Sequence, residues 1–373
     1  MLVGVPREIK VHEYRVGLTP ASVRELIGRG HGVMVERGAG AGISAGDDVY
    51  AAAGAEIVAS GEDVFASAEL IVKVKEPQPG ERKRLRPGQA LFTYLHLAPD
   101  PDQARDLIAS GAVCIAYETV TSPSGGLPLL APMSEVAGRM SVQVGASCLE
   151  KERGGMGMLL GGVPGVAPGK VTILGGGVVG ANAALIAAGM GARVIVIDRS
   201  LEVLRRLVQS FGTGVMTVFS TAEAVEQHVL SADLVVGGVL VPGAAAPRLV
   251  TAATVKRMKR GAVVVDVAID QGGCFETSRP TTHADPTYVA DGVVHYCVTN
   301  MPGAVPRTST YALNAATLPF VLELAGRGWR EALKRDPHLR AGLNICEGKV
   351  THRMVADALG LACADALQAL RNL

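Results

Sequence analysis

The stretch from Val171 to Asp198, VTILGGGVVGANAALIAAGMGARVIVID, predicts a strand, a glycine turn, a helix and a second strand that ends in an acid. Gly175, Gly177 and Gly180 have the G-x-G-x-x-G spacing. The first glycine permits a tight turn, the second lets backbone amides approach a pyrophosphate, and the third lets the helix pack close to the strand. Asp198 stands where a carboxylate accepts hydrogen bonds from adenosine ribose hydroxyls. The stretch therefore predicts a dinucleotide-binding unit, with the pyrophosphate on the helix N-terminus.

The same stretch has an alternative interpretation as a membrane helix. No charged residue lies between Lys170 and Arg193, and this run is long enough to span a bilayer. Three consecutive glycines at 175–177, with β-branched residues before them and alanines after them, fit a strand followed by a helix better. The first ten residues, MLVGVPREIK, lack the apolar segment of a secretory signal. We therefore expect neither a membrane span nor export.

Composition narrows the class of protein further. The 373 residues predict two domains, and 36 basic against 35 acidic residues give no electrostatic reason to expect nucleic acid or an anionic membrane as a partner. Aromatic residues make up only 4%, which argues against stacking platforms for single-stranded nucleic acid. The six cysteines show no metal-ligand spacing, so we expect reduced core thiols, a cytoplasmic protein and no metal site.

Apolar runs recur between helical stretches from the glycine turn onward. The predicted strands are VTIL at 171, VIVID at 194, MTVFS at 216, DLVVGGVL at 233, AVVVDVAID at 262 and VVHYCVTN at 293. Continuous Val and Ile runs are typical of parallel strands covered by helices on both faces. We expect an α/β fold with a doubly wound sheet of six parallel strands in the order 3-2-1-4-5-6. Residues just past strands 1, 4 and 5 would then face the cofactor, namely Val178, Val179, Val239, Leu240, Val267, Ala268, Ile269 and Asp270.

The first 130 residues also alternate strand and helix, which predicts a second Rossmann-like domain. Three strands, IVKVK at 71, ALFTYLHL at 90 and VCIAYETV at 113, deliver Lys75, His96 and Glu118 at or near their carboxyl ends. In an open parallel sheet this is the edge at which ligands bind. Glu118 is interpreted as structural, as is His283.

Helix signals complete the domain assignment. Thr19 and Pro20 mark a helix start, with Ser22 and Glu25 as a capping box, and Ser134 is expected to cap the helix that begins near Pro132. The tail after about residue 306 is rich in Leu and Ala and is expected to be helical, without a strand of its own. We place it against the first domain. The expected domains are therefore 1–130 with 307–373 for the substrate, and 131–306 for the dinucleotide.

Sequence motifs in both domains carry a resemblance to a known family. The motifs that carry the resemblance are PREIK, Arg15 in EYRVGLTP, VKVKEP, TYLHLA, PMSEVAGRM, the glycine turn, VDVAIDQGGCFETSRPTTH and VTNMPGAVPRTST. From residue 1 to about 350 the chain resembles the alanine dehydrogenase/transhydrogenase family. The chain departs from the family pattern at Ala245, where lysine is common, and at Val203, where a basic residue is common. The resemblance implies reversible, NAD-dependent oxidative deamination of L-alanine to pyruvate and ammonium, by a homo-oligomer that is usually a hexamer.

The resemblance implies roles for four residues that residue type alone leaves open. Arg15 and Lys75 would bind the substrate carboxylate, although an arginine or lysine in such a place is often a solvated charge. His96 and Asp270 would be catalytic and handle protons, although the first could be a core histidine and the second a cap on the QGG turn. For the cofactor, the resemblance adds Ser134, Ser220, Arg279, Val298, Thr299, Asn300 and Met301 to the residues of the glycine turn and to Asp198.

Two other functions remain open from the sequence. The chain could be the nucleotide-binding, hydride-exchanging component of a transhydrogenase, because that component shares the architecture. It could also be a dehydrogenase of another amino acid, since one methylene in a pocket is worth only about 1–3 kcal/mol of selectivity.

Overall fold

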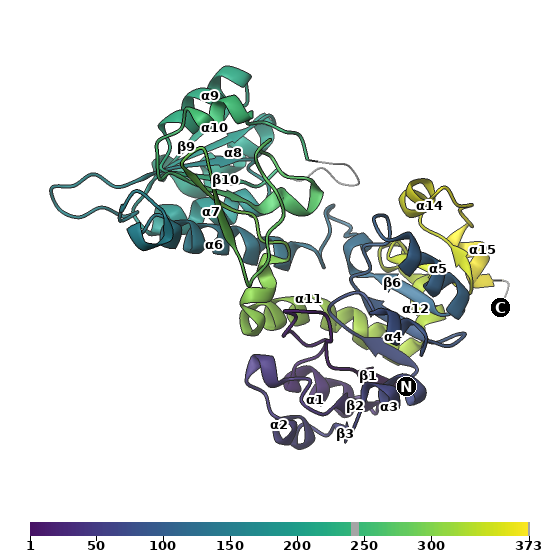
Figure 1. The fold of residues 1–373 in the computed structure, drawn as a ribbon. Helices are drawn as coiled ribbons and strands as arrows, with labels where there is room; N and C mark the ends of the chain where they lie inside the picture. The colour runs from purple at the N-terminus through teal and green to yellow at the C-terminus, as the bar shows by residue number, and fades with distance from the viewer. Residues whose placement is uncertain (240–245, 372–373) are drawn as a thin grey trace. The chain divides into compact units, whose positions relative to one another are not determined.

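The computed structural model describes residues 1–239 and 246–371. Its contacts divide the chain into two compact units, one formed by Met1–Met133 with Val305–Leu373 and the other by Ser134–Ala304 (Figure 1). Each unit is built on one predominantly parallel sheet. We call the first the substrate unit and the second the nucleotide unit, after the ligands that the sequence predicts for them.

The sheet of the nucleotide unit has seven strands in the order β12-β13-β11-β10-β7-β8-β9. Six of them are parallel and follow the predicted order 3-2-1-4-5-6. The seventh, β12, is an antiparallel edge strand paired with β13, and the expectation of only six strands was wrong here. The strands are β7 (Lys170–Leu174), β8 (Arg193–Asp198), β9 (Val215–Phe219), β10 (Leu234–Gly237), β11 (Val263–Asp266), β12 (Thr287–Ala290) and β13 (Val293–Tyr296).

Helices cover both faces of this sheet. On one face, Val225 of α9 and Val255 of α10 share an apolar cluster with Ile195 of β8. On the other face, the glycine turn before α7 lies so close to α8 that a Cβ on Gly176 would be 2.8 Å from Leu207 of α8. This two-sided cover explains the Val and Ile runs. The helical elements are α6 (Ala131–Cys148), η3 (Lys151–Arg153), α7 (Val178–Gly189), α8 (Leu201–Phe211), η4 (Gly212–Gly214), α9 (Ala222–Ser231), α10 (Ala252–Lys256), η5 (Val267–Gln271) and η6 (Met301–Ala304).

The start of α6 corrects one prediction. The helix begins at Ala131, three residues before Ser134, so Ser134 lies inside the first turn and is not the N-cap. Pro132, at the second helical position, is tolerated there because the first amides of a helix have no carbonyl partner within the helix.

The sheet of the substrate unit has eight strands in the order β15-β14-β6-β5-β4-β1-β2-β3. The strands are β1 (Leu2–Val5), β2 (Gly32–Glu36), β3 (Glu56–Val58), β4 (Leu70–Val72), β5 (Ala90–Thr93), β6 (Val113–Ala116), β14 (Leu343–Cys346) and β15 (Lys349–Val350). The first six are parallel, whereas β14 is antiparallel to β6 and β15 is antiparallel to β14. The tail therefore contributes two strands, and the expectation of a wholly helical tail was wrong.

Helix α1 of this unit begins at a standard N-cap. Thr19 accepts a hydrogen bond from the amide of Ser22 and Pro20 is the first residue of α1, as predicted. The predicted capping box was wrong, because the hydroxyl of Ser22 donates to Asn314 of α11. The helical elements are α1 (Pro20–Gly28), η1 (Ala41–Ile43), α2 (Asp47–Ala52), α3 (Gly61–Ser67), α4 (Pro79–Arg82), α5 (Pro101–Ser110), η2 (Tyr117–Thr119), α11 (Pro306–Arg327), α12 (Trp329–Arg335), α13 (Pro337–Arg340), α14 (Arg353–Leu359) and α15 (Ala366–Arg371).

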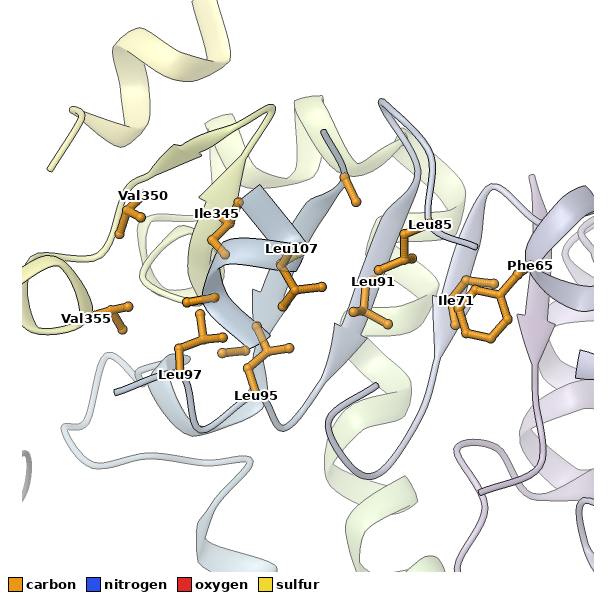
Figure 2. Close-up of a cluster of buried hydrophobic side chains, with 14 of the residues drawn as sticks. Phe65, Ile71, Leu85, Leu91, Leu95, Leu97, Leu107, Ile345, Val350 and Val355 are labelled. Atoms are coloured by element: carbon orange, nitrogen blue, oxygen red, sulfur yellow. The ribbon is translucent and has the colours of Figure 1, made fainter. Parts of the chain in front are cut away.

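An apolar cluster on one face of the eight-stranded sheet joins the first part of the chain to its tail (Figure 2). Ile71 and Leu91 of the central strands and Leu107 of α5 belong to the same cluster as Ile345 of β14 and Val355 of α14. Each fully buried aliphatic side chain of this kind contributes about 1.5–3 kcal/mol. The tail is therefore an integral part of the core that supports the edge carrying Lys75 and His96.

Candidate functional site

The glycine turn of the nucleotide unit leaves room for an anion at the start of α7. Gly175 has a φ of +92°, which permits the tight turn after β7. A Cβ on Gly180 would lie 1.8 Å from the carbonyl oxygen of Gly175, so only glycine allows this close packing. A Cβ on Gly177, the N-cap, would meet nothing within 4 Å, and no side chain caps the helix. This open N-terminus fits a pyrophosphate.

Asp198 is held in place at the end of β8. Its Oδ2 accepts a hydrogen bond from the amide of Gly176 at 2.7 Å, and its Oδ1 accepts one from the amide of Ser200 at 2.7 Å. The amide of Ser220, which follows β9, donates to the backbone carbonyl of Asp198 at 3.0 Å. The carboxylate is thereby fixed beside the glycine turn, which fits the predicted contact with a ribose.

Asp270 lies on a loop whose two ends are hydrogen-bonded to a buried carboxylate. Asp266, fully buried at the end of β11, accepts from the amide of Ala268 at 3.2 Å, the amide of Cys274 at 2.8 Å and the hydroxyl of Ser278 at 2.6 Å. Burial raises the pKa of Asp266, while these hydrogen bonds oppose the rise. The loop from 267 to 278 is fixed at both ends, and Asp270 is exposed on its 3-10 segment.

The remaining predicted cofactor residues are spread over the nucleotide unit. Arg279 is exposed and its guanidinium lies 4.0 Å from the centre of the Tyr288 ring. Val298 forms a bridge with Thr281, and Asn300 has a φ of +58°. The same unit contains the other predicted cofactor residues, which are Ser134, Val178, Val179, Val239, Val267, Ala268, Ile269, Thr299 and Met301. Leu240 and the family departure at Ala245 lie outside the described residues, whereas Val203 is in α8.

Arg15 of the substrate unit is buried and held by a carboxylate. Its side chain is 1% exposed, and that of Glu13 is 0% exposed. Arg15 Nε donates to Glu13 Oε1 at 2.6 Å and Nη2 donates to Glu13 Oε2 at 2.5 Å, while Nη1 points at the sulfur of Met133 at 3.0 Å. Burial alone would lower the pKa of Arg15, but Glu13 outweighs it and the pKa is raised. The interpretation of Arg15 as a solvated surface charge is excluded.

Lys75 lies near Arg15, three residues after β4 ends at Val72. Burial lowers the pKa of Lys75, and the positive charge of Arg15 lowers it further. The two cations are therefore close enough to influence one another electrostatically, which fits the predicted binding of a small carboxylate.

His96 follows β5 in a strained but accessible position. Its φ is +50°, its side chain is 45% exposed and its ring stacks on that of Tyr94 at 5.8 Å, so it is not a core histidine. Glu118 accepts from the amide of His96 at 2.7 Å and from the amide of Leu95 at 3.2 Å, and its Oε1 lies 4.0 Å from the Nδ1 of His96. Glu118, interpreted as structural from the sequence, thus fixes the backbone that presents His96.

Sequence reasoning missed several residues that build this region. Glu8 and Glu13 stand inside the motifs that carried the family resemblance, but only Arg15 was singled out there. Tyr94 lies close to two of the predicted residues. Its ring stacks on that of His96. Burial raises the pKa of Tyr94, and the nearby positive charge of Arg15 opposes that rise. Of the four residues given roles in the chemistry, Arg15, Lys75 and His96 share the substrate unit, and Asp270 belongs to the nucleotide unit.

The described part of the chain carries no sign of a metal centre or a membrane span. There, no group of three or more His, Cys, Asp or Glu side chains is arranged to hold a metal ion. Over the same residues, no helix is both long and apolar enough to cross a membrane, and the uncharged run of 171–192 forms most of β7, the glycine turn and all of α7. All six cysteines are free thiols.

Comparisons with known proteins agree with this arrangement. The alanine dehydrogenase/PNT N-terminal domain matches residues 4–137 and the C-terminal domain of the same family matches residues 141–353. The alanine dehydrogenase of Halomonas elongata is 60% identical over 98% of this chain and 99% of its own length, and that of Mycolicibacterium smegmatis is 55% identical over 99% and 100%.

Solved structures give the same result. An L-alanine dehydrogenase superposes with a TM-score of 0.94 at 52% identity, covering 96% of this chain and 99% of its own. The transhydrogenase from Sinorhizobium meliloti superposes with a TM-score of 0.81 at 25% identity over 95% and 99%. With both of its domains matched and its full length aligned to such relatives, this chain belongs to the alanine dehydrogenase/PNT family.

Proposed function

We propose that this protein is an L-alanine dehydrogenase. In the deaminating direction, alanine, NAD⁺ and water give pyruvate, ammonium, NADH and a proton. The observation that carries the proposal is the full-length likeness to curated alanine dehydrogenases at 53–60% identity. The side chains of the substrate unit support it, because they combine an anion site with an accessible histidine.

Arg15 and Lys75 bind the carboxylate of alanine or pyruvate. Glu13 holds the guanidinium of Arg15 in place through its Nε and Nη2 groups, which fixes the orientation of the cation that we assign to the substrate. Lys75 supplies a second positive charge. Burial and the charge of Arg15 both lower the pKa of Lys75, so its charged form is unfavourable in the free protein. A bound carboxylate removes that cost, which favours substrate over a neutral ligand.

His96 moves the protons of water addition. After the Cα–H bond of alanine is broken, water adds to the iminium carbon and a carbinolamine forms, which loses ammonia. An imidazole is the side chain that most often accepts and returns protons in catalysis. The exposure of His96 supports this role. We assign the second proton-handling role to Asp270, whose exposed carboxylate lies on the loop fixed by Asp266.

The nucleotide unit holds a nicotinamide dinucleotide, which we propose to be NAD. When bound, this cofactor supplies the acceptor for the hydride from Cα. The residues assigned to it are those of the glycine turn, Asp198 and the further residues named above. Asp198 favours NAD because its carboxylate hydrogen-bonds a free ribose diol and repels a 2′-phosphate.

Three further properties of the protein belong to this proposal. The family resemblance suggests a homo-oligomer, a hexamer, with small molecules as its only other partners. The free thiols support a cytoplasmic location, because reducing compartments keep cysteines unpaired. Nucleic acid and membranes are not proposed as partners.

A panel of amino acids tests the function. The purified protein is mixed with NAD⁺ and alanine, glycine, serine, 2-aminobutyrate or lysine, and NADH absorbance is followed; pyruvate and ammonium with NADH test the reverse reaction. We expect the largest kcat/KM for L-alanine. Transfer of hydride between NADH and an oxidised NADP analogue, without turnover of any amino acid, would instead identify a transhydrogenase component.

A further inference from the structure

Three charged side chains are buried together under the segment that carries Lys75. The ammonium of Lys73 is 0% exposed and donates to Glu8 Oε2 at 3.1 Å and to Glu81 Oε1 at 2.8 Å. The side chains of Glu8 and Glu81 are 2% and 3% exposed. Burial alone would lower the pKa of Lys73, but the two carboxylates raise it, so Lys73 is charged at neutral pH.

The second carboxylate oxygen of Glu8 accepts a hydrogen bond from the backbone of Lys75, the residue predicted to bind the substrate. Glu8 Oε1 accepts from the amide of Val74 at 2.7 Å and from the amide of Lys75 at 3.3 Å. Glu8 therefore connects Lys73, through Oε2, to the two residues that follow it. Glu81 makes no such contact, because its Oε2 accepts from the amide of Gln78 at 2.7 Å.

The same two residues are fixed on their carbonyl side by the next strand. The hydroxyl of Thr93 donates to the carbonyl of Lys75 at 3.0 Å, and the amide of Tyr94 donates to the carbonyl of Val74 at 3.2 Å. Since β4 ends at Val72, no regular strand pairing holds Lys75 itself. Its backbone is held instead by the side chains of Glu8 and Thr93.

Stability alone does not account for this cluster. Two carboxylates and one ammonium are removed from water, and apolar residues of similar volume often serve the fold equally well or better. What an apolar cluster lacks is an acceptor for the amides of Val74 and Lys75. The geometric result of the buried charges is a fixed backbone at Lys75.

We propose that Glu8 is a positioning residue, which, held by Lys73, sets where the ammonium of Lys75 meets the substrate carboxylate. This inference rests on the proposed function, which gives Lys75 that role. Because Lys75 has a neighbouring cation in Arg15, its ammonium would otherwise move away from the place where the substrate needs it.

Two substitutions of Glu8 separate positioning from folding. In Glu8→Gln, one carboxamide oxygen must serve the three donors that two carboxylate oxygens serve now, and its NH₂ group faces either Lys73 or the amides. In Glu8→Asp the charge beside Lys73 is kept, but the side chain is one methylene too short to hold Lys73 and both amides. We expect each to raise the KM for pyruvate and for alanine by about tenfold, with a smaller change in kcat.

Glu81→Gln is the matched control. It breaks the other ion pair of Lys73 and leaves the contacts with Val74 and Lys75 in place. We expect its melting temperature to fall like that of Glu8→Gln, while its KM for pyruvate stays within about twofold of the wild type. The affinity for NADH, measured by fluorescence, should stay constant in all three variants.

The outcomes of this experiment are distinct. A wild-type protein that does not turn over alanine or pyruvate overturns the proposed function, and this inference with it. An active wild type whose Glu8→Asp variant keeps its KM for pyruvate, whether or not Glu8→Gln folds, overturns the inference alone and leaves Glu8 with a structural role. An equal rise of KM in Glu81→Gln also overturns it, because the effect would then follow loss of the ion pair and not loss of the amide contacts.

Discussion

Glu13 binds Arg15 along one edge of the guanidinium, with Nε to Oε1 at 2.6 Å and Nη2 to Oε2 at 2.5 Å, and both side chains are buried. Glu13 and Arg15 are two residues apart in the loop after β1, so this loop supplies both the arginine and the carboxylate that neutralises it. A buried arginine without Glu13 would be a strongly unfavourable charge. The pair therefore lets the unit keep a charged guanidinium in its interior.

The first prediction concerns Arg15→Lys. An ammonium cannot make two parallel hydrogen bonds to Glu13 and also meet a carboxylate in the plane of a fork. We expect the KM for pyruvate to rise about 10- to 150-fold, which corresponds to the loss of about 1.5–3 kcal/mol for one hydrogen bond to a charged group. NADH affinity should not change, and Arg24→Lys, an exposed position on α1, is the control. Unaltered pyruvate saturation would place the carboxylate site elsewhere.

The second prediction links function to stability at Lys75. Because burial and Arg15 lower the pKa of Lys75, its charged form is less favourable in the folded than in the unfolded chain. Lys75→Met should therefore raise the melting temperature at pH 7 while pyruvate binding is lost. The stability difference should shrink as pH rises from the lowered pKa of Lys75 towards the ordinary value of 10.5, since the wild-type lysine is then neutral. A lower melting temperature at pH 7 would contradict this account.

The sequence predicted the nucleotide unit well because its signals are local. The parallel strands are short runs rich in Val and Ile, and the structure shows why Gly175, with its positive φ, and Gly180, with its close packing, must be glycines. The strands that were missed lack such runs. Strand β12 is only the four residues TYVA directly after Pro286, β14 is the four residues LNIC and β15 is the pair Lys349–Val350, so each is too short and too mixed to stand out as a run of Val and Ile.

The substrate unit was less predictable because its polar groups are paired over long sequence distances. Glu8 and Lys73 are 65 residues apart and bond directly, and His96 and Glu118 are 22 apart. From sequence alone, acidic residues such as Glu8, Glu13 and Glu118 are most simply interpreted as solvated or structural. Only the fold shows that each of them holds a residue of the predicted site.

The third prediction concerns His96. We expect His96→Asn to fold and to bind NADH, with kcat lower by about 10² to 10⁴-fold, the usual contribution of a positioned acid-base group. Asparagine is preferred to alanine for this test because the position has a φ of +50°, which asparagine tolerates. Turnover and NADH fluorescence are measured together. A variant with normal turnover would remove His96 from the proton steps.

The fourth prediction concerns the choice of cofactor. With Asp198 fixed beside the glycine turn, kcat/KM should be larger for NAD than for NADP. Asp198→Asn removes the charge, and we expect the ratio of the two constants to shift towards NADP by about tenfold or more, because a like charge near the 2′-phosphate is gone. Arg199 is adjacent and exposed, and it would then have no competing carboxylate. A wild-type preference for NADP would overturn the assignment.

The fifth prediction separates two glycines of the turn. In Gly177→Ala the new Cβ meets nothing within 4 Å, so the free protein should keep its melting temperature within a few degrees. The methyl group nevertheless occupies the space before α7 that we assign to the pyrophosphate, and NADH affinity should fall by about tenfold or more. In Gly180→Ala the Cβ would lie 1.8 Å from the carbonyl oxygen of Gly175, so stability itself should fall.

Gly189→Ala, at the other end of α7, is the control for both, because its Cβ also meets nothing within 4 Å. It should change neither the melting temperature nor NADH binding. Thermal melts and NADH fluorescence titrations on the three variants therefore distinguish a glycine needed for packing from one needed for the ligand. If Gly177→Ala binds NADH as tightly as the wild type does, the pyrophosphate does not lie on this turn, and the assignment of the glycine motif is wrong.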